Sequence, residues 1–323
     1  MQAVKKYFTA LIYVLIATPV FLAFLGILDF PYDVDAPLTQ QEVVAAQNYY
    51  TDAYQAPASE GETPSEYETK YLRLAEEYAK AHRIEEHVAA FAKEFNLTRR
   101  AVLEIGSGRG YLQDVVENYT GLDISRSVAR FYHKKFVVGS ATALPFPDNS
   151  FDGVWTIWVF EHVPNPEQAF REARRVTRDN GVIYLLPAWN CSPWAAEGYE
   201  ARPYSDFDLA GKLVKASLIV RANPAFRIAS ILPVRGVRTL VAQFGPTRLR
   251  YRRLAPNYEK YWVPDSDAVN SIDRQEAKLW FLSRGDECVN CGGTLSDYSS
   301  ALVIRVHKSS RETDRLRGSD ATN

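Results

Sequence analysis

The sequence predicts an α/β fold built on a mostly parallel β-sheet with helices on both faces. Two observations carry this prediction. From residue 101 onward, short apolar runs alternate with stretches of helical spacing, as the strands and crossover helices of a doubly wound sheet do. A glycine-rich turn at residues 106–110 follows the first apolar run, where a strand of such a sheet passes into its helix.

Each element follows from its own stretch of sequence. The apolar runs predict parallel strands at 101–105, 119–124, 136–140, 151–159 and 181–188. Helical spacing predicts helices at 110–119, 127–136, 165–177 and 271–285. Two last apolar runs, 286–292 and 300–308, predict an antiparallel strand pair that closes a seven-stranded sheet.

The N-terminal segment predicts a membrane anchor over residues 1–30. The run from Tyr7 to Leu28 carries no charge. As a helix it would extend roughly 33 Å, enough to cross a bilayer core of about 30 Å. A cleaved signal peptide is the alternative. Lys5 and Lys6 precede the run and the next basic residue is Lys70, so the positive-inside rule would place the remainder outside.

Residues 31–63 are expected to form a linker with a short helix, which Thr39 and Glu42 would begin as a capping box. A second helix start follows, with Thr63 as N-cap and Pro64 at the first helical position. An apolar stripe continues from there to Phe95 and is expected to pack in the core. The polar tail at 309–323 is expected to be disordered.

Composition limits the partners of this chain. With a net charge of −1 over 323 residues, no overall field favours nucleic acid. Three cysteines form no disulfide framework. The pair Cys288 and Cys291 is expected to lie in a strand or turn, and no metal site is predicted.

Residues 191–264 interrupt the alternation and predict an inserted segment on the substrate side. This stretch is basic, and residues 210–222 have the spacing of an amphipathic helix. Two interpretations stay open: the insert rests on an anionic membrane surface, or it is a solvated basic face over a core helix. Its arginines are Arg221, Arg227, Arg235, Arg238, Arg248, Arg250, Arg252 and Arg253.

The glycine turn has the pattern G-x-G-x-G. A dinucleotide fingerprint needs glycine at the sixth position, where this chain has Tyr111. Without Cβ atoms, the turn lets its backbone approach a ligand closely. Asp123 stands at the end of the next predicted strand, where an acid in this kind of fold accepts hydrogen bonds from ribose hydroxyls. Asp123 as a plain turn residue is the alternative.

Together with the run LPFPDNSFD at 144–152, these segments resemble the class I S-adenosylmethionine-dependent methyltransferases, in particular the type 11-like branch that acts on small molecules and lipids. The resemblance covers about residues 101–188. It implies a Rossmann-like methyltransferase domain over 64–308, with S-adenosyl-L-methionine as cofactor.

The resemblance also implies a set of cofactor residues. Glu104 and the backbone of the turn would hold the methionine part, and Asp123 would bind the ribose. The adenine would meet Ile124, Ser140 and Ala141, although the family often has Asp where this chain has Ser140. The complete set is Glu104, Gly106, Ser107, Gly108, Gly110, Asp123, Ile124, Ser140, Ala141 and Thr156, the last beside the methyl group.

Methyl transfer mainly requires positioning, and a base is needed only where the acceptor must lose a proton. Glu161 and His162 are the candidate bases, and the alternative for His162 is a role in shaping its loop.

Trp189 and Trp194 follow the fifth predicted strand, where they would either contact the substrate or pack in the core. The expected acceptor is a small or lipid-like molecule methylated on O, N or C.

Two other functions compete with this one. An NAD(P)-dependent oxidoreductase shares the strand–turn–helix pattern, and a non-catalytic protein that binds S-adenosylmethionine shares the family resemblance. Because S-adenosylmethionine is kept in the cytosol, the catalytic domain of a single-pass membrane protein is expected on the cytosolic side, against the charge rule.

Overall fold

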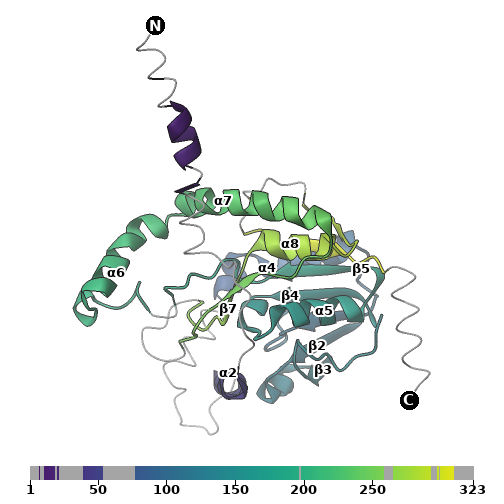
Figure 1. Ribbon diagram of the computed structural model, residues 1–323. Coiled ribbons are helices and arrows are strands. Elements are labelled where there is room, and N and C mark those ends of the chain that lie inside the picture. Colours follow the sequence, from purple (N-terminus) through teal and green to yellow (C-terminus); the bar gives the residue numbers. More distant parts are fainter. Residues whose placement is uncertain are drawn as a thin grey trace. The chain divides into compact units, whose positions relative to one another are not determined.

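The computed structural model describes residue 7 and residues 11–18, 20–21, 39–53, 77–195, 198–257, 265–291, 297 and 299–308. The chain divides into two compact units, and Figure 1 labels helices and strands of both. The first, called here the sheet unit, comprises Ala36–Pro187, Gly285–Cys291 and Ala301–Asn323. The second, called here the insert unit, comprises Met1–Asp35, Ala188–Arg284 and Gly292–Ser300. The predicted insert at 191–264 therefore belongs to a unit that continues to Arg284.

The sheet unit contains the expected seven-stranded, mostly parallel sheet, so the Rossmann-like α/β class is confirmed. Its strand order is β3-β2-β1-β4-β5-β9-β8. The first five strands are parallel, whereas β9 pairs antiparallel with β5 and β8 with β9. The strands are β1 (Val102–Ile105), β2 (Tyr119–Asp123), β3 (Lys135–Val138), β4 (Phe151–Ile157), β5 (Thr177–Leu186), β8 (Glu287–Cys288) and β9 (Leu302–Arg305).

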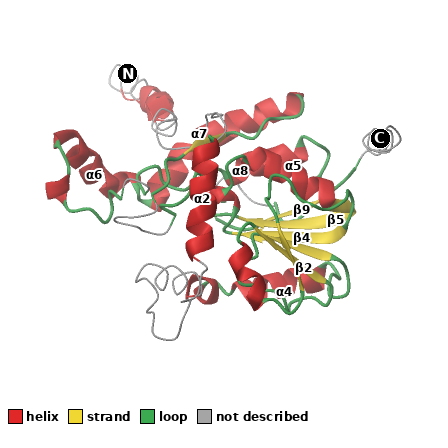
Figure 2. Ribbon diagram, turned by 90° about the horizontal axis from the view of Figure 1, so that it is seen from below, coloured by secondary structure: helices red, strands yellow, loops and turns green. Residues whose placement is uncertain are grey.

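Helices cover both faces of this sheet (Figure 2). On one face, α4 (Ile84–Glu94) buries Val88 and Phe91 against strand residues that include Trp155. On the other, α5 (Pro166–Val176) begins at Asn165, whose side chain accepts a hydrogen bond from the Gln168 amide at 3.2 Å. All residues of β1 and β2 are buried, on both faces, as expected of parallel strands between two helical layers.

The helix predicted at 110–119 is wrong. Residues 110–118 form successive turns, because backbone groups of this segment bond to neighbours outside it. The Lys134 ammonium donates to the carbonyl of Val116 at 2.8 Å, and the Glu117 amide donates to the carbonyl of Thr98 at 2.8 Å. Adjacent β-branched residues, Val115 and Val116, also weaken a helix here.

The helix predicted at 127–136 is also wrong in its extent. A short 3-10 helix, η1, covers Arg126–Phe131, and the chain is extended again from Lys135, where β3 pairs with β2. The predicted short helix of the linker is found as α2 (Gln40–Ala53). The helix start predicted at Thr63 lies outside the described residues.

The structure describes only parts of the predicted membrane anchor, Tyr7 to Leu28. Within those parts and the other described ranges, no helix is long and apolar enough to span a bilayer, so the expected transmembrane helix is not found there.

The two cysteines of the CxxC pair form a disulfide that was not predicted. Cys288 lies in β8, as expected for a strand residue, and is joined to Cys291 in a disulfide. Cys191 is a buried free cysteine. The spacing alone did not indicate this bond.

The insert unit is built around three helices, α6 (Leu209–Arg221), α7 (Pro224–Val241) and α8 (Arg274–Leu282), with a two-stranded sheet of β6 (Tyr251–Arg253) and β7 (Asn270–Ile272). Asp273 caps α8 by accepting from the amides of Gln275 and Glu276. The same carboxylate forms a buried ion pair with Arg235 of α7 at 2.7 Å. A second pair, Arg238 with Glu276, also joins α7 to α8.

Arg174 of α5 joins three parts of the sheet unit. Its guanidinium donates to Asp286 at 2.8 Å and to the carbonyl of His307 at 2.9 Å, and both ion-pair partners are buried. We expect Arg174→Met to lower the free energy of unfolding by about 3–5 kcal/mol, because the buried carboxylate of Asp286 would lose the guanidinium that balances its charge. Urea unfolding measures this effect. Arg99→Met, which removes an exposed pair with Glu117, is the control and should change little.

Candidate functional site

The predicted site residues lie at or near the carboxyl ends of β1, β2, β3 and β4. The strand order reverses between β1 and β4, since the chain runs from β1 outward to β3 and then returns to β4. Open α/β sheets bind ligands in the crevice outside such a reversal. The loops that follow the two strands meet there, because Gly106 lies directly against Val159.

The turn after β1 requires its glycines. Gly106, Gly108 and Gly110 have φ of 71°, 48° and 73°, a region that other residues seldom adopt. The amides of Gly106 and Ser107 both donate to the carbonyl of Leu122, at 2.8 and 3.0 Å, which holds the turn on β2. A Cβ on Gly106 would lie 2.3–2.9 Å from the Val159 side chain.

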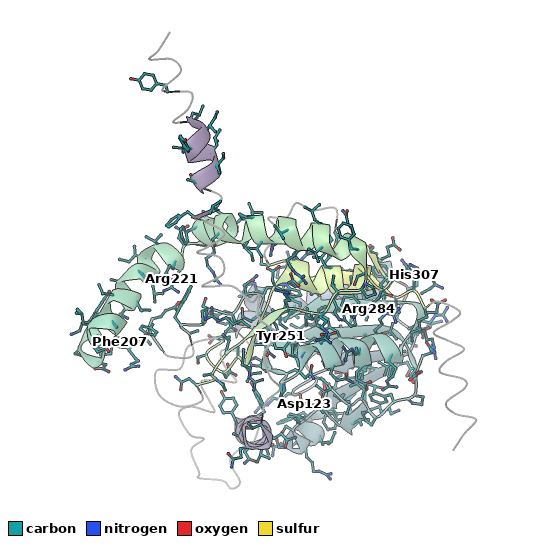
Figure 3. All side chains as sticks on the ribbon, viewed as in Figure 1. Asp123, Phe207, Arg221, Tyr251, Arg284 and His307 are labelled. Carbon is teal, nitrogen blue, oxygen red and sulfur yellow. A yellow bond between two sulfur atoms is a disulfide. The ribbon has the colours of Figure 1, made fainter. Side chains whose placement is uncertain are left out.

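Asp123, labelled in Figure 3, ends β2 and is bonded directly to the glycine turn. Its carboxylate accepts from the Gly108 amide at 2.9 Å on one oxygen and from the Ser125 amide at 2.9 Å on the other. Burial raises the pKa of Asp123, and the amide hydrogen bonds oppose this shift. Asp123, predicted to bind a ribose, and the glycine turn, predicted to hold a methionine, are therefore adjacent.

Glu104 is a buried residue of β1, the strand that leads into the glycine turn. Its carboxyl group accepts a hydrogen bond from the Tyr119 hydroxyl. Burial raises the pKa of Glu104 to about 8, because a carboxylate loses the solvation that water gives it. The strand that leads into the glycine turn thus contains an acid with a raised pKa.

Tyr132 is a site residue that the sequence reasoning missed. Its hydroxyl lies 2.7 Å from the Ser107 hydroxyl, 3.0 Å from the Ser107 carbonyl and 2.9 Å from the Gly108 carbonyl. Its ring occupies the space over Gly121, where a Cβ would approach within 2.7 Å. A glycine inside β2 was the available signal, since it marks a close approach of another group.

The predicted adenine residues lie beside Asp123. The Gly139 amide donates to the Asp123 carbonyl at 2.9 Å, which brings the following residue, Ser140, next to the end of β2. The Ser140 hydroxyl is 2.9 Å from that of Thr142. Ile124 exposes 36% of its surface, whereas Ala141 is buried.

Thr156 is the next-to-last residue of β4. It is 1% exposed, and its hydroxyl has no hydrogen-bond partner among the described residues. Its place beside a methyl group stays a prediction.

The candidate bases follow β4 on a short 3-10 helix, η2 (Phe160–His162). Glu161 is fully buried, and its Oε1 lies 3.7 Å from Nε2 of His162. The His162 ring meets the ring of Tyr50 from α2 at 5.6 Å, edge to face. Helix α2 also contacts η1, which follows β2, because the Ser127 hydroxyl donates to the Thr51 carbonyl at 3.3 Å. Helix α2 therefore adjoins the ends of both strands.

Trp189 and Trp194 belong to the insert unit, where both are buried and bonded. The Trp189 indole donates to the Ser300 carbonyl at 3.1 Å, and that of Trp194 to Glu200 at 3.0 Å. Arg221 and Arg227 lie over the Trp194 ring at 5.0 and 5.7 Å. These contacts favour packing as the role of both tryptophans.

The sheet unit is an open α/β domain whose predicted cofactor residues lie at the reversal of its strand order. Residues 103–185 match the family model described as "Methyltransferase domain". This match supports a class I S-adenosylmethionine-dependent methyltransferase domain in this part of the chain. The match favours this class over the oxidoreductase alternative.

Several known proteins are similar to this chain. A ubiquinone/menaquinone biosynthesis C-methyltransferase of Hahella chejuensis is 33% identical over 37% of this chain and 49% of its own length. A fatty-acid O-methyltransferase of Mycolicibacterium smegmatis is 26% identical over 53% of this chain and 68% of its own. The chain spans about half the length of the first curated relatives it matches.

Among solved structures, phosphoethanolamine N-methyltransferase 1 of Haemonchus contortus, in complex with phosphoethanolamine and S-adenosylhomocysteine, aligns with a TM-score of 0.26 and 23% identity. The alignment covers 28% of this chain and 23% of that one.

Proposed function

We propose that this protein transfers a methyl group from S-adenosyl-L-methionine to a small-molecule or lipid-like acceptor. The observation that carries the proposal is the bonded pair of glycine turn and Asp123 at the carboxyl ends of β1 and β2. Three of the turn's five residues are glycines without a Cβ atom, and an acid stands next to the turn, which suits a cofactor that combines an amino acid with a nucleoside.

The turn, Glu104, Asp123 and Ile124 each have a physical reason for the predicted role. The turn from Gly106 to Gly110 accommodates the methionine part, with Glu104 beneath it as the acid that can face a cationic group. Each Asp123 oxygen already accepts one amide hydrogen bond, and a carboxylate oxygen can accept a second one from a ribose hydroxyl. The exposed side chain of Ile124 offers an apolar surface for the adenine.

When bound, the cofactor supplies a methyl group on a good leaving group, so the protein mainly orients the two reactants and excludes water. The acceptor class is supported by the names of relatives, which include a fatty-acid O-methyltransferase and a 2-methyl-6-phytyl-1,4-hydroquinone methyltransferase. Their shared feature is an acceptor with a long apolar part.

Calorimetry with the full chain and S-adenosylmethionine tests the cofactor assignment. We expect Asp123→Asn to weaken binding by about 10- to 100-fold, because hydrogen bonds to a charged group contribute ~1.5–3 kcal/mol. Asp114→Asn is the matched control, since Asp114 is exposed and pairs only with surface groups in the described structure. Wild-type protein that fails to bind millimolar cofactor would refute the proposal.

Labelled methyl transfer to extracted lipids and metabolites tests catalysis. If the acceptor must lose a proton to His162, His162→Gln should lower kcat by ~100-fold or more while cofactor affinity is kept. Equal loss of affinity would instead indicate that His162 shapes its loop. Cofactor binding without any turnover would support a binding protein.

We further propose that residues 7–28 attach the chain to a membrane, with the methyltransferase domain on the cytosolic side. The uncharged run of 22 residues supports attachment, and the location of the methyl donor supports the orientation. Alkaline extraction of membranes tests attachment, and a reporter that is active on one side only tests orientation when fused to the C-terminus.

A further inference from the structure

The solvent-facing side of α6 is apolar, which is the reverse of an ordinary surface helix. Seven positions of α6 are exposed, and only Lys212 among them is charged. The others are Leu209, Ala210, Leu213, Ala216, Ile219 and Val220. Leu209, Leu213, Ile219 and Val220 expose between 54% and 83% of their surface. Figure 3 labels Phe207 and Arg221, which flank and end this helix. Large apolar residues that recur on an exposed face indicate an interaction surface.

The end of α7 repeats this arrangement. Val237, Leu240 and Val241, together with Phe244 of the short 3-10 helix η4 (Ala242–Phe244), follow one another at helical spacing and expose 48–90% of their surface. The polar side of α7 faces inward, where Arg235 and Arg238 pair with the acids of α8. Because these charges are satisfied inside the unit, the apolar residues remain on the outside.

The charge of the same stretch indicates what covers it. Residues 209–258 contain ten lysines and arginines and no aspartate or glutamate. Arg235 and Arg238 are neutralised by Asp273 and Glu276, whereas Lys212, Arg248 and Arg250 are exposed. A second copy of this chain would bring the same exposed cations against these, so self-association is disfavoured by repulsion. An anionic bilayer offers both an apolar interior and negative headgroups, and interfacial helices combine exposed apolar residues with flanking lysine and arginine in this way.

We propose that α6 and the C-terminal end of α7 lie on the surface of an anionic lipid bilayer, with the exposed apolar residues inserted among the acyl chains. This inference does not depend on methyl transfer. It is also separate from attachment by residues 7–28, because it concerns where the insert unit lies once the chain is at a membrane.

The experiment uses the full chain with one environment-sensitive fluorophore, attached at Leu213→Cys, at Leu240→Cys or at the control Glu117→Cys. Glu117 is an exposed residue of the sheet unit, outside the proposed surface. Unlabelled wild type, treated with the same reagent, reports any labelling of the native cysteines. The vesicles are phosphatidylcholine, with or without phosphatidylglycerol, and carry brominated acyl chains as a quencher. All variants keep residues 7–28, so differences between positions report local insertion.

We expect a blue shift and loss of emission at positions 213 and 240 with anionic vesicles, weaker effects with neutral vesicles or high salt, and no quenching at position 117. The further substitutions Leu213→Glu and Val220→Glu, at exposed sites that keep the fold, should reduce quenching of the probe at 240. Absence of quenching at both 213 and 240 on vesicle-bound protein would overturn the proposal. A blue shift that grows with protein concentration and needs no lipid would also overturn it, in favour of a protein partner.

Discussion

Gly106→Ala should remove cofactor binding and weaken the fold. The new Cβ would meet the Val159 side chain, including its Cβ at 2.9 Å, so the loop after β4 would have to shift. In addition, the φ of 71° is unfavourable for alanine by roughly 1–2 kcal/mol. Overpacking adds about 1–3 kcal/mol. Calorimetry with S-adenosylmethionine and urea unfolding of the same preparation measure the two effects.

Gly236→Ala is the matched control for this substitution. Gly236 lies in α7, has no atom within 4 Å of an added Cβ, and sits in a helix that alanine favours by about 1 kcal/mol. It should therefore keep cofactor affinity and raise stability slightly. The double variant Gly106→Ala with Val159→Ala should recover part of the stability, since it removes the collision but leaves the backbone strain. Wild-type affinity and stability in Gly106→Ala would contradict the site geometry.

Glu104 should make the protein less stable as the pH rises. Burial raises its pKa to about 8, whereas the unfolded chain releases this proton near the ordinary carboxyl value. Between these two values the folded state holds a proton that the unfolded state has lost. Stability is therefore highest at the acidic end of this range and falls toward pH 8, by up to ~1.4 kcal/mol per pH unit from this group.

Glu104→Gln removes the titration while keeping an oxygen that accepts from Tyr119. The variant should lose less stability than wild type between pH 5 and about pH 8. Above about pH 8 the variant should be more stable than wild type. Urea unfolding across this range measures the difference. Glu117→Gln, at an exposed acid, should follow the wild-type curve. Parallel curves for wild type and Glu104→Gln would show that Glu104 is not buried as described.

Much of the site was accessible from the sequence because its signals are local. The glycines at 106, 108 and 110 are needed for their own backbone angles, and Asp123 follows directly from the end of a strand. Tyr132 was not accessible in this way. Its hydroxyl reaches the Ser107 and Gly108 carbonyls across 24 or 25 residues, and no spacing in the sequence encodes such a contact.

The same distinction applies to the helices. The segments that became α5, α6 and α8 have the expected spacing and begin at Asn165, Asp208 and Asp273, whose side chains cap them. Residues 110–118 also have helical spacing, but hydrogen bonds to Lys134 and Thr98 replace the helix. Local spacing therefore predicts a helix only where no more distant group competes for the backbone.

The strands of the sheet, the glycine turn and the acid beside it follow from local signals, because burial patterns and backbone angles are properties of neighbouring residues. Which side of a helix faces outward depends instead on contacts with residues that are distant in the sequence. In α6 and α7 that side is the apolar one, because the polar groups of α7 find partners inside the insert unit, on α8.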